Sequence, residues 1–151
     1  MTDVLLPLAL LYADGCREIR GATKLQKLAF LAQEEYGVEE LHNFKPDKYG
    51  PFSPSLASAV NALEQKGLVR EREEQVPGGN KMLVYSLTDK GVRVLKKLLH
   101  DRDEDIERML ESAEDVKKDW GYSSLDRLLQ HVYQSYPRYT SESRLDLAEE
   151  V

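Results

Sequence analysis

The chain has few of the residues that build disulfide frameworks and metal centres. Its 151 residues include one cysteine, Cys16, and three histidines, His42, His100 and His131. A single thiol excludes both a disulfide framework and a cage of thiolates around a metal. The histidines are not spaced as paired ligands, and the acidic run at 101–105 lacks the glycine and spacing of a calcium loop. The sequence therefore predicts no metal site and no cofactor.

Long hydrophobic runs are also missing. The apolar run from Val4 to Tyr12 is about half the length that a membrane-spanning helix needs. It has neither the basic leader nor the small-residue cleavage site of a signal peptide. Because disulfides are rare in reducing compartments, the single cysteine agrees with an intracellular environment. We expect a cytoplasmic protein that has no membrane partner.

An overall excess of positive charge is absent. The formal net charge is −6, of which residues 1–99 contribute +1 (14 Lys and Arg, 13 Asp and Glu) and residues 100–151 contribute −7 (7 and 14). This excludes a basic footprint over the whole protein but still allows a local basic face. No glycine-rich phosphate loop, nucleophile elbow or pair of catalytic carboxylates can be recognised. The sequence predicts a non-enzymatic protein with no catalytic residues.

What the sequence does contain is helical periodicity and one strong hairpin signal. Apolar residues recur at helical spacing over 4–12, 24–36, 54–66, 88–99, 105–119 and 124–136. Alternating residues on either side of Pro77-Gly78-Gly79-Asn80 predict two strands, 68–76 and 81–87. A short strand is expected at 18–20. The predicted fold class is mainly α with a small β-hairpin.

The order of these elements is that of a winged-helix domain. The junction from Tyr85 to Gly91 also resembles that of MarR- and PadR-type winged-helix regulators, which implies a third helix in the DNA major groove and a wing on the backbone. We therefore expect a winged-helix-like domain over 1–99. An acidic helical C-terminal extension over 100–151 would pack on it, or form a homodimer through 105–120. The 17-residue link from Gly37 to Ser53 is longer than the short turn of a helix-turn-helix.

Two segments carry a closer family resemblance. The segment Thr23-Lys24-Leu25-Gln26-Lys27-Leu28, followed by Tyr49-Gly50-Pro51 and a helix, resembles the Panacea domain of SocA-like antitoxins and related phage-associated proteins. The family motif residues are Lys24, Leu25, Gln26, Lys27, Tyr49, Gly50 and Pro51. The resemblance implies a protein that neutralises a toxin or adapts a partner protein, without catalysis. The hairpin and the acidic extension lie outside that pattern.

Two hypotheses for function follow. The first is a DNA-binding transcriptional regulator that uses the third helix, a lysine face and the wing. Its candidate nucleic-acid-binding residues are Lys24, Lys27, Ser53, Ser55, Ser58, Asn61, Arg70, Arg72, Asn80 and Lys81. The third helix carries no arginine, which argues against strong base readout because arginine to guanine is the commonest specific contact.

The second hypothesis is an antitoxin or adaptor that binds a protein partner. Phe30 and Leu31 fall opposite the core face of the second predicted helix, so they need a second cover: the C-terminal tail, another subunit or a partner. The candidate partner-binding residues are therefore Lys24, Lys27, Phe30 and Leu31. Purely structural interpretations remain beside these. The lysines would be a solvated face, Gln26 would tether the 38–50 loop, and Tyr49-Gly50-Pro51 would set the angle of the third helix.

Overall fold

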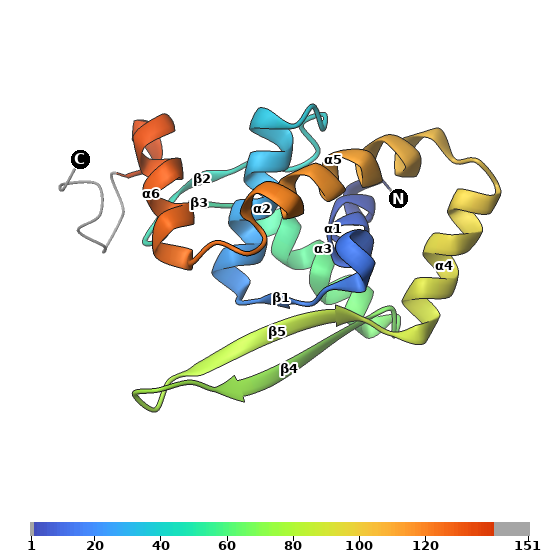
Figure 1. The fold of residues 1–151 in the computed structure, drawn as a ribbon, viewed down its shortest axis with the longest axis horizontal. Coiled ribbons are helices and arrows are strands. Elements are labelled where there is room, and N and C mark those ends of the chain that lie inside the picture. Colours follow the sequence, from blue (N-terminus) through green and yellow to red (C-terminus); the bar gives the residue numbers. More distant parts are fainter. Residues whose placement is uncertain (1, 141–151) are drawn as a thin grey trace.

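The computed structural model describes residues 2–140 and is mainly helical, with two small antiparallel sheets (Figure 1). The helices are α1 (Leu5–Cys16), α2 (Ala22–Glu35), α3 (Pro54–Gln65), α4 (Asp89–His100), α5 (Glu104–Trp120) and α6 (Leu125–Ser135), with 3-10 turns at Thr2–Val4 and Pro137–Tyr139. The strands are β1 (Ile19–Arg20), β2 (Lys45–Asp47), β3 (Gly50–Phe52), β4 (Val69–Gln75) and β5 (Lys81–Leu87). The predicted helices and the predicted hairpin are confirmed.

Local chemistry sets most of these boundaries. The regular part of α1 ends where Ala13 becomes extended and Asp14 and Gly15 take positive φ values of 58° and 63°. The N-terminus of α3 is capped by the Ser53 hydroxyl, which accepts a hydrogen bond from the Leu56 amide, and Pro54 takes the first turn. The second helix starts two residues earlier than predicted, because α2 begins at Ala22, directly after Gly21.

The larger sheet has the order β1-β5-β4, so β5 lies in the centre and pairs antiparallel with both neighbours. Its β4–β5 hairpin runs along one side of the helices and extends past β1 (Figure 1). The smaller sheet is the β2–β3 hairpin, which lies within the long link before α3. Its turn falls at Lys48 and Tyr49, and Gly50 to Phe52 form a strand.

One hydrophobic core joins both sides of the expected domain boundary at residue 99. The apolar seam of α5 packs against α1 of the same chain, and Ile106, Ala113 and Val116 are fully buried. The extension therefore packs on the rest of its own chain, and this seam is not available for a homodimer through 105–120. Residues 141–151 of the predicted extension lie outside the described residues.

The second apolar face of α2 is also covered from within the chain. Phe30 makes edge-to-face contacts with Phe44, Tyr136 and Tyr139, at ring-centroid distances of 5.3, 5.0 and 5.0 Å. Phe30 and Leu31 are both completely buried. The prediction that these two residues contact a partner is therefore wrong, because the chain's own C-terminal segment and 38–50 loop occupy that face.

Candidate functional site

Two glutamines of α2 hold the long link and the start of α3 in place. The Gln26 amide donates to the Ser53 carbonyl at 3.1 Å and accepts from the Ser53 amide at 2.8 Å. Gln33 makes the same two-bond contact with the backbone of His42, both at 3.0 Å. Gln26 therefore tethers a distant segment of backbone, as the structural interpretation predicted. The segment that it holds is the start of α3, and the 38–50 loop is held by Gln33 instead.

Lys27 is a buried structural residue. Its ammonium donates to the Pro51 carbonyl at 2.8 Å, and only 2% of the residue is exposed. Burial lowers the pKa of Lys27 to about 7, and the nearby Asp47 opposes the shift. The prediction that Lys27 grips DNA or a partner is wrong, because the side chain is enclosed. The two motif segments of the chain are instead joined to each other.

Gly50 completes this junction. Its φ is +88°, and a Cβ there would lie 3.0 Å from Cε1 of Tyr133 and 3.5 Å from Cε of Lys27. A glycine is therefore favoured here, because the positive φ strains other residues and a Cβ would lie tightly against Tyr133. The segment around Gly50 is packed between α2 and α6 and positions α3 from one side.

Two more lysines bind backbone carbonyls instead of facing solvent. Lys24 donates to Gly121 and Ser123 at 2.7 and 3.1 Å, and burial lowers its pKa. Lys117, missed in the sequence, is 1% exposed and donates to the carbonyls of Ala13 and Arg17 at 2.8 and 2.7 Å. Burial lowers the pKa of Lys117 to about 8. Its place one helical turn after the buried Ala113 was a signal that could have found it.

Arg72, a candidate nucleic-acid-binding residue of the β4–β5 hairpin, is paired with carboxylates. Arg72 forms ion pairs with Glu18 at 2.9 Å and with Glu74 at 2.8 Å. Arg20 also pairs with Glu74, and the hydrogen bonds from these two arginines lower the pKa of Glu74 to about 2. Because both guanidinium groups already face carboxylates, little positive charge is left at these two arginines for phosphates.

The remaining candidate nucleic-acid-binding residues form two groups: some already bond to other residues of the chain, and the others are exposed. Ser53 is completely buried as the cap of α3, so its predicted contact with DNA is wrong. The Ser55 hydroxyl bonds to Nδ1 of His42 at 2.7 Å, and Lys81 pairs with Glu73 at 3.2 Å. Four predicted nucleic-acid-binding residues are exposed without such a contact: Ser58, Asn61, Arg70 and Asn80.

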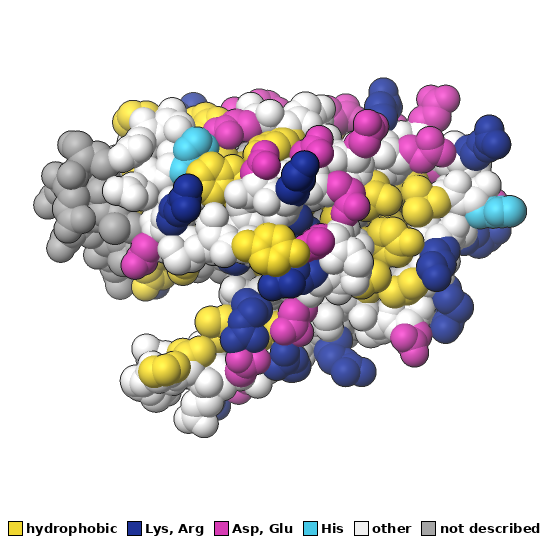
Figure 2. Space-filling view, viewed as in Figure 1, with side chains coloured by type: hydrophobic (Ala, Val, Ile, Leu, Met, Phe, Trp, Pro, Cys, Tyr) yellow, Lys and Arg dark blue, Asp and Glu magenta, His cyan; other side chains and the backbone are white. Residues whose placement is uncertain are grey.

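A groove of about 440 Å³ lies beside α3, between α2, the β2–β3 hairpin and the β4–β5 hairpin. We call it the α3 groove, and we call the part of its lining that is formed by Leu25, Ala57 and Val60 its apolar floor. Figure 2 shows that the molecule is hollowed between the β4–β5 hairpin and the helices, and that basic and acidic side chains are interspersed over this face. The groove is larger than a pocket of about 280 Å³ beside Val38 and Met109 and another of about 170 Å³ beside Arg17 and Tyr122.

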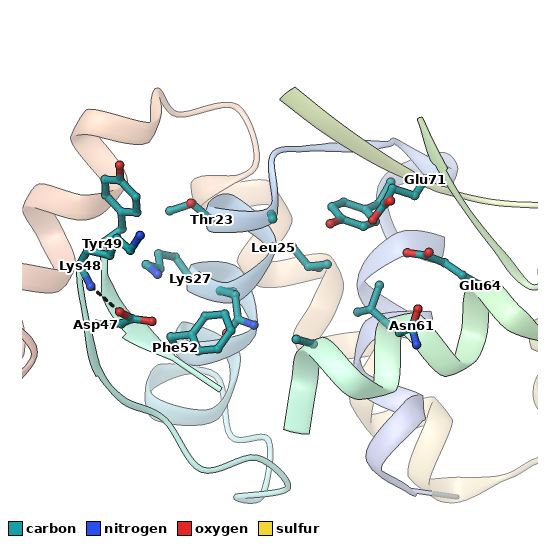
Figure 3. A pocket seen from close by; sticks show the side chains of 15 residues that line it. Thr23, Leu25, Lys27, Asp47, Lys48, Tyr49, Phe52, Asn61, Glu64 and Glu71 are labelled. Carbon is teal, nitrogen blue, oxygen red and sulfur yellow. Dashed lines mark hydrogen bonds between the residues drawn. The ribbon is translucent and has the colours of Figure 1, made fainter. Parts of the chain in front are cut away.

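The two ends of the α3 groove differ chemically (Figure 3). At one end Lys27, Asp47, Lys48 and Tyr49 lie close together, with Asp47 accepting a hydrogen bond from the Lys48 amide at 2.8 Å. The other end lies across Leu25 and contains only acidic and neutral groups. The first end is therefore mixed in charge and the second is acidic.

The acidic end is formed by Glu64 of α3 and Glu71 of β4. Burial and the neighbouring Glu71 raise the pKa of Glu64 to about 7. Burial and Glu71 also raise the pKa of Tyr85, which lines the same end. Among residues 2–140, no Lys, Arg or His pairs with Glu64 or Glu71. Sequence reasoning missed this pair because only the packing of α3 on β4 brings the two carboxyl groups together.

Within residues 2–140 there is no group of three or more His, Cys, Asp or Glu side chains placed to hold a metal ion. None of the helices described here has both the length and the apolar composition to cross a membrane. No protein-family model matches the chain, and a search of curated proteins finds no match.

Proposed function

We propose that this chain is a regulatory protein of the antitoxin or adaptor type, which binds a segment of a partner protein in the α3 groove. The observation that carries the proposal is the groove itself. It has an apolar floor, and at one end it has the carboxyl groups of Glu64 and Glu71, which form no ion pair with a basic residue among residues 2–140. Its volume of about 440 Å³ lies within the range of pockets that bind ligands. The resemblance to the Panacea domain supports a protein partner.

Electrostatics favour a protein over a nucleic acid in this groove. Lys24 and Lys27 bind backbone carbonyls, and Arg72 is held by two carboxylates. Glu64 and Glu71 would repel phosphates that approach α3. An apolar floor with charge at its rim is, by contrast, an arrangement that recognises short protein segments.

The proposal is tested with two tryptophan variants of α3. Ala57 is exposed on the groove floor, so Ala57→Trp fills the groove. Ser58 is exposed on the same helix but does not line the groove, so Ser58→Trp is the matched control. Proteins captured from the native cell would be purified, and the complex would be reconstituted and its stoichiometry measured.

We expect a stoichiometric complex that Ala57→Trp abolishes and Ser58→Trp retains. Circular dichroism of both variants establishes that they are folded. A reconstituted complex that tolerates Ala57→Trp would show that the partner binds elsewhere, and the proposal would fail.

DNA binding is a second candidate, favoured by a different observation. The elements follow the winged-helix order, with the β4–β5 hairpin after α3 and β1 paired with β5. In winged-helix proteins the third helix enters the DNA major groove, and this order supports the same role for α3. The exposed residues Ser58, Asn61, Arg70 and Asn80 would then make the contacts. In this alternative the chain is a winged-helix transcriptional regulator.

One assay separates the two candidates. Fluorescence anisotropy with random-sequence duplex DNA at low and moderate salt detects phosphate contacts, since such binding weakens steeply with salt. If DNA is the ligand, Arg70→Ala weakens binding and lowers the salt slope by about one. Glu64→Gln combined with Glu71→Gln would then tighten DNA binding by removing repulsion. Absence of binding even at low salt would remove this candidate.

A further inference from the structure

The charge of the acidic end of the α3 groove indicates which kind of side chain can bind there. Glu64 and Glu71 come from different elements, α3 and β4, and meet beside Tyr85 at the groove's rim. Two carboxyl groups in contact repel each other when both are ionised, so a cation between them is stabilised by both. Burial, together with the neighbouring Glu71, raises the pKa of Glu64.

We infer that the partner segment presents a lysine or arginine side chain to Glu64 and Glu71, with its aliphatic stem on the apolar floor of the α3 groove. This inference rests on the proposed function and names the chemistry of the partner. The floor residues Leu25, Ala57 and Val60 lead to the acidic end. Lysine and arginine side chains commonly bury their methylene stems in this way while the charged group reaches a polar rim.

Other occupants fit the acidic end less well. A divalent metal ion requires about six oxygen ligands, and no group of three metal-ligating side chains occurs within residues 2–140. An acidic segment or a phosphate would add a third negative charge. At the opposite end, Asp47 lies beside Lys27 and Lys48, so charge there discriminates less between partners. The acidic end therefore decides the charge of the occupant.

The test uses a random-peptide library displayed on phage. Peptides are selected on the wild-type protein and counter-selected on Ala57→Trp, so that only groove-dependent sequences remain. We expect lysine and arginine to exceed aspartate and glutamate among them. A selected peptide, made synthetically, should bind the Glu64→Gln, Glu71→Gln double variant at least about tenfold more weakly, because a charge-assisted contact is lost.

Two controls make the test specific. Glu73→Gln removes a carboxylate from the same strand that is paired with Lys81 away from the groove, and it should leave peptide affinity within about twofold. Replacing the basic residue of the selected peptide by norleucine should reduce affinity for the wild-type protein to the level of the double variant. The glutamine substitutions keep side-chain size and remove repulsion, so the variant is expected to fold.

The outcomes are distinguishable. Groove-dependent peptides with no excess of basic residues, or with unchanged affinity for the double variant, would overturn this inference and leave the proposed function standing. Selection that yields no groove-dependent peptide would overturn both.

Discussion

Substituting Lys27 by methionine tests whether this motif lysine is a structural residue. Its ammonium is enclosed and donates to the Pro51 carbonyl at 2.8 Å. Burial lowers its pKa from 10.5 to about 7 in the folded protein, whereas the unfolded chain keeps the ordinary value. Between pH 7 and 10.5 the unfolded state therefore holds a proton that the folded state has released.

The sign and size of the effect follow from proton linkage. Because the unfolded state binds more protons, the free energy of unfolding rises with pH in this window, by at most about 1.4 kcal/mol per pH unit. The contribution of Lys27 to the free energy of unfolding should therefore be about 3 kcal/mol larger at about pH 9.5 than at about pH 6.5. Methionine has a similar shape and does not titrate, so Lys27→Met lacks this contribution.

The assay is urea denaturation of both proteins at several pH values and constant ionic strength, followed by circular dichroism. The free energy of unfolding of the wild type minus that of Lys27→Met should rise with pH by about 3 kcal/mol over the stated range. Lys27→Arg is the matched control: it keeps a charge that does not titrate, so it should be destabilised at every pH. A difference between wild type and Lys27→Met that is constant with pH would refute the reasoning and indicate a solvated Lys27.

Three other outcomes are expected from the structure. Phe30→Ala removes the centre of an aromatic cluster and should lower the free energy of unfolding by about 3–5 kcal/mol; a loss below about 1 kcal/mol would contradict the burial of this face. Gly50→Ala places a Cβ 3.0 Å from Tyr133 at a residue with positive φ. It should lower the free energy of unfolding by about 1–3 kcal/mol and lower the thermal midpoint. An unchanged midpoint would contradict the observed turn. Glu71→Gln should raise stability near pH 8 by roughly 0.5 kcal/mol and by less near pH 5. The reason is that burial and Glu71 raise the pKa of Glu64 from 4.5 to about 7, so ionisation of Glu64 destabilises the folded protein as the pH rises through this range. An equal gain at both pH values would contradict the Glu64–Glu71 contact.

Much of the fold was predictable because its determinants are local. Helical periodicity predicted the seam of α5, and the Pro77–Asn80 turn with flanking alternation predicted β4 and β5. The start of α3 is also determined locally, because the Ser53 cap and the first-turn Pro54 act within a few residues. These features were confirmed almost to the residue.

The candidate site was less predictable, because side-chain environment depends on what packs from elsewhere in the chain. Periodicity placed Phe30 opposite the core face of α2, but it did not show that Tyr136 and Tyr139 cover it. The same limitation made Lys27 look like a surface cation although Pro51 and its neighbours enclose it. A helical face shows which residues point the same way, and only the fold shows which faces are covered.

The sequence by itself thus determined a mainly helical chain with one long hairpin, because hydrogen bonding and hydrophobic periodicity within short segments are encoded locally. The tertiary structure alone decided that the motif lysines are internal tethers, and that Glu64 and Glu71 meet at the end of the α3 groove. Burial and charge proximity depend on residues far apart in sequence, so the chemistry of this site exists only once α2, α3 and the β4–β5 hairpin have packed together.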